Sequence, residues 1–123
     1  MKTILIADDN DSNRELVCVI LQRLGYQVLE AGNGREAVER ILEGHPDLAL
    51  LDIHMPEMNG YEAIRAIRAN ADICKLPVVA LTASAMVGDA QEAIDHGFDA
   101  YLAKPYEIAA VIALVKKLLD EKS

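Results

Sequence analysis

Four short apolar runs of the chain end in polar side chains. These side chains are Asp8 and Asp9, Asp52, Thr82 and Lys104. If the runs are strands of one parallel sheet, all of these side chains lie at its carboxyl edge, where ligands bind in such folds. Three carboxylates, a hydroxyl and an ammonium group would then share one crevice.

Carboxylates that meet in one crevice repel each other. At an effective dielectric constant of about 20, two like unit charges about 4 Å apart cost roughly 4 kcal/mol. Lys104 offsets part of this repulsion, and a hard divalent cation held by Asp8, Asp9 and Asp52 would offset the rest. Mg²⁺, with Mn²⁺ as an alternative, suits a site that keeps several water ligands. We therefore interpret the adjacent acids Asp8 and Asp9 as a metal-binding corner rather than a solvated turn.

A carboxylate beside Mg²⁺, a lysine and a hydroxyl is equipped for phosphoryl transfer. An aspartate can act as nucleophile and form an aspartyl phosphate. The metal and a lysine can then neutralise the charge that spreads over the equatorial oxygens. Asp52 is the expected nucleophile because it ends the central run, and Asp8 and Asp9 are the expected metal ligands.

Five apolar runs alternate with amphipathic stretches and must position these groups. The runs are residues 3–7, 27–31, 47–51, 77–81 and 100–103. The first helical stretch ends at Gly25, and the other four cover residues 33–44, 61–70, 87–96 and 108–119. This alternation predicts an α/β fold with five parallel strands, doubly wound by five helices, in the flavodoxin-like order 2-1-3-4-5. The length fits a single domain over residues 1–123.

Local patterns predict two helix starts, and a third pattern resembles a nucleotide-binding motif. Ser12 and Glu15 form a capping-box pattern for the first helix, and Asn33 can cap the second. The stretch Gly32-Asn33-Gly34 with Ala37 imitates a dinucleotide fingerprint. That interpretation would leave the polar strand ends unexplained, so a tight turn into the second helix is preferred.

Composition excludes several classes of function. The net charge of −8 argues against direct nucleic-acid binding and favours cations or basic protein partners. No apolar run approaches the ~20 residues that span a bilayer, so no membrane insertion is expected. Cys18 and Cys74 lack paired spacing, which favours reduced thiols in the cytoplasm. The three histidines lack the spacing of a zinc site.

Four motifs in order resemble the receiver domain of two-component response regulators. They are ADDN at 7–10, LLDIHMPEMNG at 50–60, ALTA at 80–83 and YLAKP at 101–105. The resemblance covers essentially the whole chain and looks closest to receivers attached to hybrid sensor kinases or to single-domain relatives. It implies a phosphohistidine donor, either a histidine kinase or a histidine phosphotransfer protein. No DNA-binding or catalytic effector follows Leu119, so we expect either that the output is contact with a protein target or that the chain was excised from a larger protein.

The resemblance also implies a role for each site residue. Asp52 would be the phosphoacceptor, Asp9 a direct Mg²⁺ ligand and Asp8 a water-mediated one, with the backbone carbonyl of His54 as a further ligand. Thr82 and Lys104 would bind the phosphoryl oxygens. Tyr101 occupies the position of a switch aromatic, which would act on a face made of the fourth helix, the fifth strand and the fifth helix. His54 and Ser84, each two residues past a site residue, are expected to modulate the lifetime of the phosphorylated state.

Two other classes of function use similar parts. A haloacid-dehalogenase-like phosphatase also forms an aspartyl phosphate, but it carries the nucleophile in a D-x-D motif on its first strand, whose third position here is Asn10. A flavodoxin-like or pseudo-receiver binding module would not need the three acids together with Thr82 and Lys104. Both alternatives are therefore less favoured than a phosphoacceptor module.

Overall fold

Five strands and five helices alternate along the part of the chain that the structure describes. The computed structural model describes residues 2–55, 58–82, 89–103 and 108–120. The strands are β1 (Thr3–Ala7), β2 (Gln27–Ala31), β3 (Leu48–Asp52), β4 (Val78–Thr82) and β5 (Ala100–Ala103). The helices are α1 (Asp11–Arg23), α2 (Gly34–Gly44), α3 (Gly60–Ala69), α4 (Asp89–His96) and α5 (Ile108–Asp120). All strand pairs are parallel, and the order β2-β1-β3-β4-β5 confirms the predicted flavodoxin-like α/β fold.

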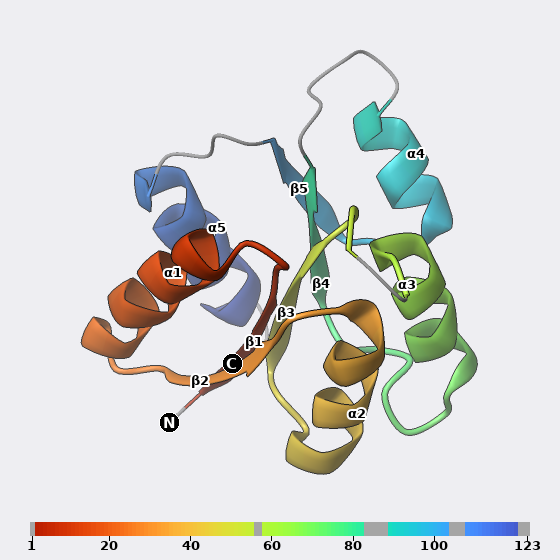
Figure 1. Ribbon diagram of the computed structural model, residues 1–123, viewed down its shortest axis with the longest axis horizontal. Helices are drawn as coiled ribbons and strands as arrows, with labels where there is room; N and C mark the ends of the chain where they lie inside the picture. The colour runs from red at the N-terminus through yellow and green to blue at the C-terminus, as the bar shows by residue number, and fades with distance from the viewer. Residues whose placement is uncertain (1, 56–57, 83–88, 104–107, 121–123) are drawn as a thin grey trace.

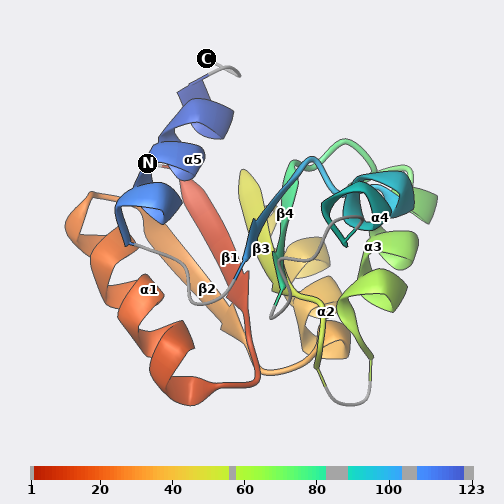
Figure 2. The same ribbon diagram turned by 90° about the horizontal axis from the view of Figure 1, so that it is seen from above.

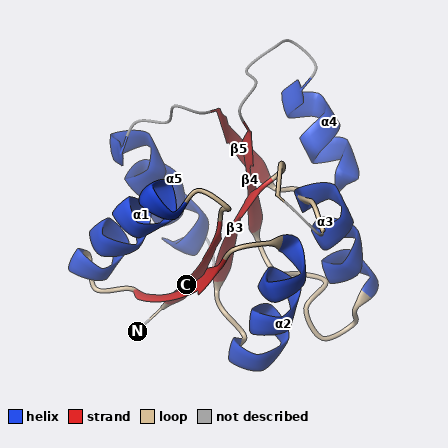
Figure 3. Ribbon diagram, viewed as in Figure 1, coloured by secondary structure: helices blue, strands red, loops and turns tan. Residues whose placement is uncertain are grey.

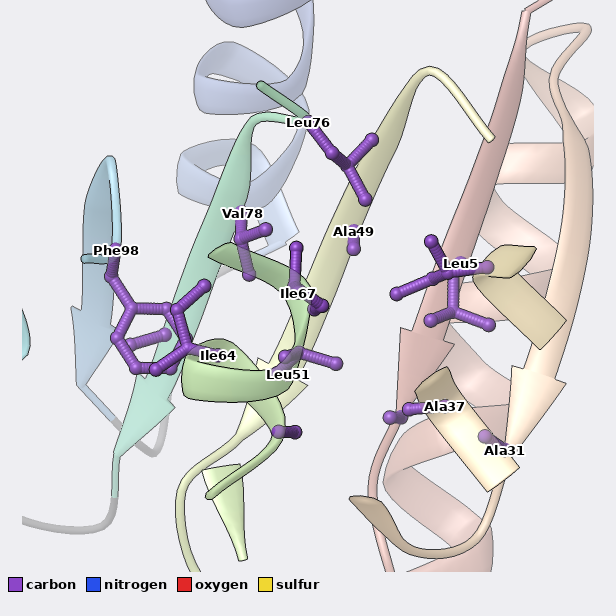
Figure 4. Close-up of a cluster of buried hydrophobic side chains, with 14 of the residues drawn as sticks. Leu5, Ala31, Ala37, Ala49, Leu51, Ile64, Ile67, Leu76, Val78 and Phe98 are labelled. Atoms are coloured by element: carbon purple, nitrogen blue, oxygen red, sulfur yellow. The ribbon is translucent and has the colours of Figure 1, made fainter. Parts of the chain in front are cut away.

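The sheet lies between two layers of helices. Helices α1 and α5 cover one face, and α2, α3 and α4 cover the other (Figures 1 and 2). Each layer has its own core, and Figure 4 shows the core under α2 and α3. The strand arrows in Figure 3 run between the layers, so the central strands have no solvent-facing side. This explains why β1, β3 and β4 are almost wholly apolar.

The register of the sheet sets which strand ends are level. Ala7 of β1 pairs with Leu51 of β3, and Thr82 of β4 pairs with Ala103 of β5. Alternate side chains of β1 enter opposite cores, with Leu5 on the side of α2 and α3 and Ile6 on the side of α1 and α5. A shift of one residue would exchange the two sets of side chains, so burial on both faces fixes this register.

The first helix begins earlier than predicted. The capping box at Ser12 is wrong, because α1 starts at Asp11 and the side chain of Asn10 accepts a hydrogen bond from the Asn13 N–H. The Asn10 N–H in turn donates to the Asp8 carboxylate at 2.9 Å, which holds Asn10 in the extended conformation of an N-cap. Ser12 therefore already lies within the first turn.

Other helix ends follow their local signals. Asn33 caps α2 as predicted, with its side chain accepting from the Glu36 N–H. A complete capping box does occur in α3, between Asn59 and Glu62. Gly25 follows α1 with a φ of 96°, a conformation that favours glycine at the end of a helix.

Helix α1 leaves part of its apolar surface exposed. Leu16 is 52% exposed, whereas Val17 and Leu21 pack into the core that α1 shares with α5. Since two helices divide this face of the sheet, each covers only part of it.

None of the helices in the described part of the chain is long and apolar enough to span a bilayer.

Candidate functional site

Three carboxylates meet at the carboxyl end of β1 and β3. Asp8 follows Ala7, whose partner Leu51 directly precedes Asp52, so the register brings the two acids level on neighbouring strands. Asp8 and Asp52 are buried and Asp9 is exposed, and one oxygen from each of the three lies within 4.8 Å of the other two. Within the described residues this is the one group of acids, histidines or cysteines with such a geometry.

Backbone N–H groups orient two of these carboxylates. Asp8 Oδ1 accepts from the Asn10 N–H at 2.9 Å, and Asp52 Oδ1 accepts from the His54 N–H at 3.0 Å. In both cases the donor lies two residues after the acid, which is the arrangement of an Asx turn. The backbone of the same turn therefore orients the carboxylates of Asp8 and Asp52.

Thr82 lies beside this group on the next strand. It ends β4 and is 4% exposed. Leu81 pairs with Asp52, so the Thr82 hydroxyl belongs to the residue just beyond that pair. The structure thus places Thr82 one residue beyond the partner of Asp52, on the strand next to β3.

The remaining predicted residues have different outcomes. Tyr101 lies in β5 opposite Ala80 and is 41% exposed. The His54 side chain is exposed, while its backbone N–H contacts Asp52. Lys104 and Ser84 lie outside the described residues, so their predicted roles stay untested.

Two glycines pack against the backbone of the segment that follows Asp52. The Gly60 N–H donates to the Ile53 carbonyl at 2.8 Å, and a Cβ atom on Gly60 would lie 2.7 Å from the Asp52 carbonyl oxygen. The Gly34 N–H donates to the Met58 carbonyl at 2.9 Å, and a Cβ atom there would collide with that oxygen. Gly34 of the dinucleotide-like stretch therefore packs closely against the Met58 backbone, whereas a Cβ atom on Gly32 would have no neighbour closer than 3.8 Å.

Arg14 joins three elements around the Asp8 corner. Its Nη1 donates to the Asp8 carbonyl at 2.7 Å, its Nη2 to the Asp11 carboxylate at 2.7 Å and its Nε to the Glu30 carboxylate at 3.2 Å. Partial burial alone would lower the pKa of Arg14, but its hydrogen bonds to Asp11 and Glu30 and their negative charges raise the pKa above its usual value. Arg14 is therefore a fixed cation with compensated charge.

Arg14 also lines an open cavity of about 420 Å³ next to the acids. The lining residues are Asp9, Asp11, Arg14, Glu30, Ala31, Gly32, Glu36 and Arg40. Sequence reasoning did not select Arg14. Its spacing of three residues from Asp11 could have predicted the helical ion pair, but the bond to the Asp8 carbonyl depends on the shape of the turn, which no local pattern specifies.

The donor set of the acidic group fits a hard divalent cation. All three groups offer carboxylate oxygens, which Mg²⁺ prefers over nitrogen and sulfur. The group contains no histidine or cysteine, so it does not have the ligands of a structural zinc site. A buried carboxylate beside such a cation and a hydroxyl has the parts needed to accept a phosphoryl group.

A protein-family model described as the response regulator receiver domain matches residues 4–116. The polar-differentiation response regulator DivK of Brucella ovis is 33% identical over 120 residues, which are 98% of this chain and 98% of that protein.

Solved structures give the same result. The receiver domain of the sensor histidine kinase PA1611 from Pseudomonas aeruginosa, with a magnesium ion coordinated in its active-site cleft, is 33% identical with a TM-score of 0.88, over 97% of this chain and 98% of that one. The chemotaxis protein CheY4 of Vibrio cholerae is 30% identical with a TM-score of 0.90, over 97% and 99% of the two chains. These similarities extend over nearly the whole chain.

Proposed function

This chain belongs to the response regulator receiver family, and on that premise we propose that Asp52 is the residue that accepts the phosphoryl group. A receiver domain is a phosphoacceptor of two-component signalling rather than a classical enzyme. The observation that carries the assignment to Asp52 is the close approach of three carboxylates, within 4.8 Å, at the end of the central strands. Asp52 ends β3, the middle strand of the sheet.

Asp8, Asp9 and Asp52 would hold a Mg²⁺ ion, with Mn²⁺ as an alternative. Their oxygens match the preference of these cations, and the exposure of Asp9 leaves room for water ligands. The backbone carbonyl of His54 is the fourth ligand that we propose from the family resemblance. When bound, the cation supplies positive charge to the phosphoryl oxygens and offsets the repulsion among the acids.

In the proposed reaction an Asp52 oxygen attacks the phosphorus of a phosphohistidine. The new O–P bond forms as the N–P bond to imidazole breaks, and the imidazole nitrogen leaves with the electron pair and takes a proton. The hydrogen bond from the His54 N–H limits rotation of the Asp52 carboxylate, which favours a single direction of attack. The Thr82 hydroxyl and the Lys104 ammonium group would bind the phosphoryl oxygens.

Membership of the receiver family implies a histidine kinase as phosphodonor, and we propose a histidine phosphotransfer protein as an alternative donor. The net charge of −8 fits a basic docking surface on such a partner and disfavours direct binding to nucleic acid. Cys18 and Cys74 are free thiols, which suit a reducing compartment, so we assign the protein to the cytoplasm.

Phosphorylation would be transmitted to the face formed by α4, β5 and α5. The Thr82 hydroxyl would turn toward the phosphoryl group, and the Tyr101 ring would turn into the space released. Tyr101 and Ile94 are both more than 40% exposed, so this face already offers apolar surface to a protein target.

The lifetime of the phosphorylated state would depend on His54 and Ser84. Each residue stands two positions after a site residue, where a side chain can screen or orient the attacking water. Replacing each by Ala and timing phosphate loss tests this role, and unchanged lifetimes in both variants would remove them from the mechanism.

Intact-mass analysis with acetyl phosphate and Mg²⁺ tests the assignment of Asp52. We expect one added phosphoryl group on the unchanged protein and none on Asp52→Asn. Normal labelling of Asp52→Asn would show that another residue is the acceptor.

NMR with beryllofluoride, a phosphoryl mimic, tests the output face. Resonances of α4, β5 and α5 should shift, and Thr82→Ala should suppress these shifts while Asp52 still accepts phosphate. Shifts confined to the pocket, or shifts that persist in Thr82→Ala, would contradict the proposed route.

A further inference from the structure

We propose that Arg14 is a positioning residue of the metal site, because its guanidinium group fixes the peptide that joins Asp8 to Asp9. This inference rests on the proposed Mg²⁺ site and adds a residue that is not itself a ligand. The side chain of Arg14 is 19% exposed, and each of its three nitrogens donates to a different segment. Those segments are the end of β1, the first turn of α1 and the edge strand β2.

The bond to the Asp8 carbonyl matters because of the planarity of the peptide group. The carbonyl of Asp8 and the N–H of Asp9 lie in one rigid plane, so holding the oxygen also orients the backbone on which Asp9 stands. The Asp8 N–H donates to the Ala31 carbonyl at 3.2 Å, and the Asp8 carboxylate accepts from the Asn10 N–H. With Arg14 at 2.7 Å from the carbonyl oxygen, the N–H, the carboxylate and the carbonyl of Asp8 all have a defined partner.

Considered alone, the positive charge of Arg14 would weaken the binding of a cation at this site. Arg14 lines the same cavity as Asp9, and a cation near a metal site weakens metal binding by Coulomb repulsion. Asp11 and Glu30 each form an ion pair with the guanidinium group, at 2.7 Å and 3.2 Å. They compensate its charge and leave its hydrogen-bond geometry as the main effect on the site.

The two effects predict opposite results when Arg14 is replaced. If Arg14 acted only by charge, Arg14→Gln would bind Mg²⁺ more tightly and Arg14→Lys would bind it as the unchanged protein does. If Arg14 positions the peptide, both variants bind Mg²⁺ more weakly. A lysine carries all its N–H donors on one nitrogen, so it cannot reproduce the bonds that three separate nitrogens of Arg14 make to Asp8, Asp11 and Glu30.

The experiment is a titration of the metal-free protein with MgCl₂ at constant ionic strength, followed by calorimetry and by amide NMR. We expect the dissociation constant for Mg²⁺ to rise about tenfold in Arg14→Gln and Arg14→Lys, as found when residues that orient metal ligands are removed. Arg40→Gln is the matched control, since it removes a positive charge from the same cavity. Its affinity for Mg²⁺ should stay the same or increase.

Tighter binding in Arg14→Gln, or unchanged binding in Arg14→Lys, would overturn the positioning role. Arg14→Lys keeps the charge and the aliphatic stem, so it decides the question even if Arg14→Gln does not fold. Failure of the unchanged protein to bind Mg²⁺ would overturn the metal site and this inference together. Binding by the unchanged protein with equal affinity in both Arg14 variants would overturn the role of Arg14 alone.

Discussion

Carboxylates lie at both ends of the parallel sheet, but they have different surroundings. At the amino end, Asp47 accepts from the Thr3 N–H at 2.8 Å, and Asp99 accepts from the Val78 N–H at 2.8 Å. Asp47 thus accepts a hydrogen bond from the first N–H of β1, and Asp99 accepts one from the first N–H of β4. At the carboxyl end, three acids instead face one another. Among the described residues, such a group of three neighbouring acids lies at the carboxyl end, where the proposed cation would offset their repulsion.

Arginines show the same difference between the two ends. Arg68, near the amino end of β4, donates to the carbonyls of Gly97, Cys74 and Leu76 and pairs with Asp99. It joins the end of α3 to residues 74–76 and to residues 97–99. Arg14, at the carboxyl end, donates to a single carbonyl, which belongs to a candidate metal ligand. One arginine therefore holds the fold together, and the other shapes a binding site.

Removal of the metal should have the largest effect. EDTA should abolish phosphorylation by acetyl phosphate, because the acids at the carboxyl end then repel one another and the phosphoryl oxygens lose their charge compensation. Asp9→Ala should impair labelling more than Asp8→Ala, as measured by intact mass. Asp99→Ala is the control from the amino end and should label normally. Full labelling in EDTA would contradict the metal-dependent mechanism.

Replacement of Arg68 should have the largest effect on stability. Arg68→Met leaves carbonyls and a carboxylate without their donor, so we expect the free energy of unfolding to fall by about 3 kcal/mol in urea denaturation. Arg65→Met, at an exposed position of the same helix, should change stability by less than about 0.5 kcal/mol. The affinity of Arg68→Met for Mg²⁺ should be unchanged, and a loss of affinity would break the contrast between the two ends.

Gly34 and Gly32, both near the carboxyl end of the sheet, test how much backbone packing around the site contributes to stability. A methyl group in Gly34→Ala would collide with the Met58 carbonyl and displace its hydrogen bond, so we expect a loss of about 1–3 kcal/mol of stability. Gly32→Ala should be nearly neutral, because a Cβ there would have no neighbour closer than 3.8 Å. Equal unfolding curves for the two variants would show that the chain near Met58 adjusts at little cost.

The two cysteines should give the smallest effect, a difference in rate of alkylation. Burial raises the pKa of the Cys18 thiol, and the nearby Glu30 carboxylate raises the pKa further. Cys18 therefore has less reactive thiolate near pH 8 than an ordinary cysteine, and it is buried whereas Cys74 is partly exposed. Iodoacetamide labelling followed by mass spectrometry should modify Cys74 first. Faster labelling of Cys18 in Arg14→Gln would indicate that the corner around β1 and β2 has opened.

The sequence was sufficient to predict the fold and the acidic group. Buried parallel strands are nearly all apolar, so a polar residue at the end of such a run, like Asp52, stands out. The alternation of strands and helices then brings these ends to one edge without any detail of the loops. Asp8, Asp9, Asp52 and Thr82 could be grouped for this reason.

The parts that could not be predicted depend on the shape of turns. The capping box at Ser12 failed because Asn10, held by the Asp8 carboxylate, took the N-cap position first. The bond from Arg14 to the Asp8 carbonyl joins a side chain to a main-chain atom, for which residue type gives no signal. Asp47 and Asp99 likewise look like ordinary loop acids until the strand that each one contacts is known.

The pairing of β1 with β3 also has a consequence for folding kinetics. Asp8 and Asp52 are far apart in the chain, and they meet only when these two strands pair across α1, β2 and α2. Such non-local pairing is a slow step in folding, and here it also brings like charges together. Mg²⁺ at the proposed site would bind the assembled acids and not the extended chain, so it would stabilise the native state by an amount that grows with the logarithm of its concentration above the dissociation constant. A cation bound at the proposed site would thereby also oppose the separation of the two central strands.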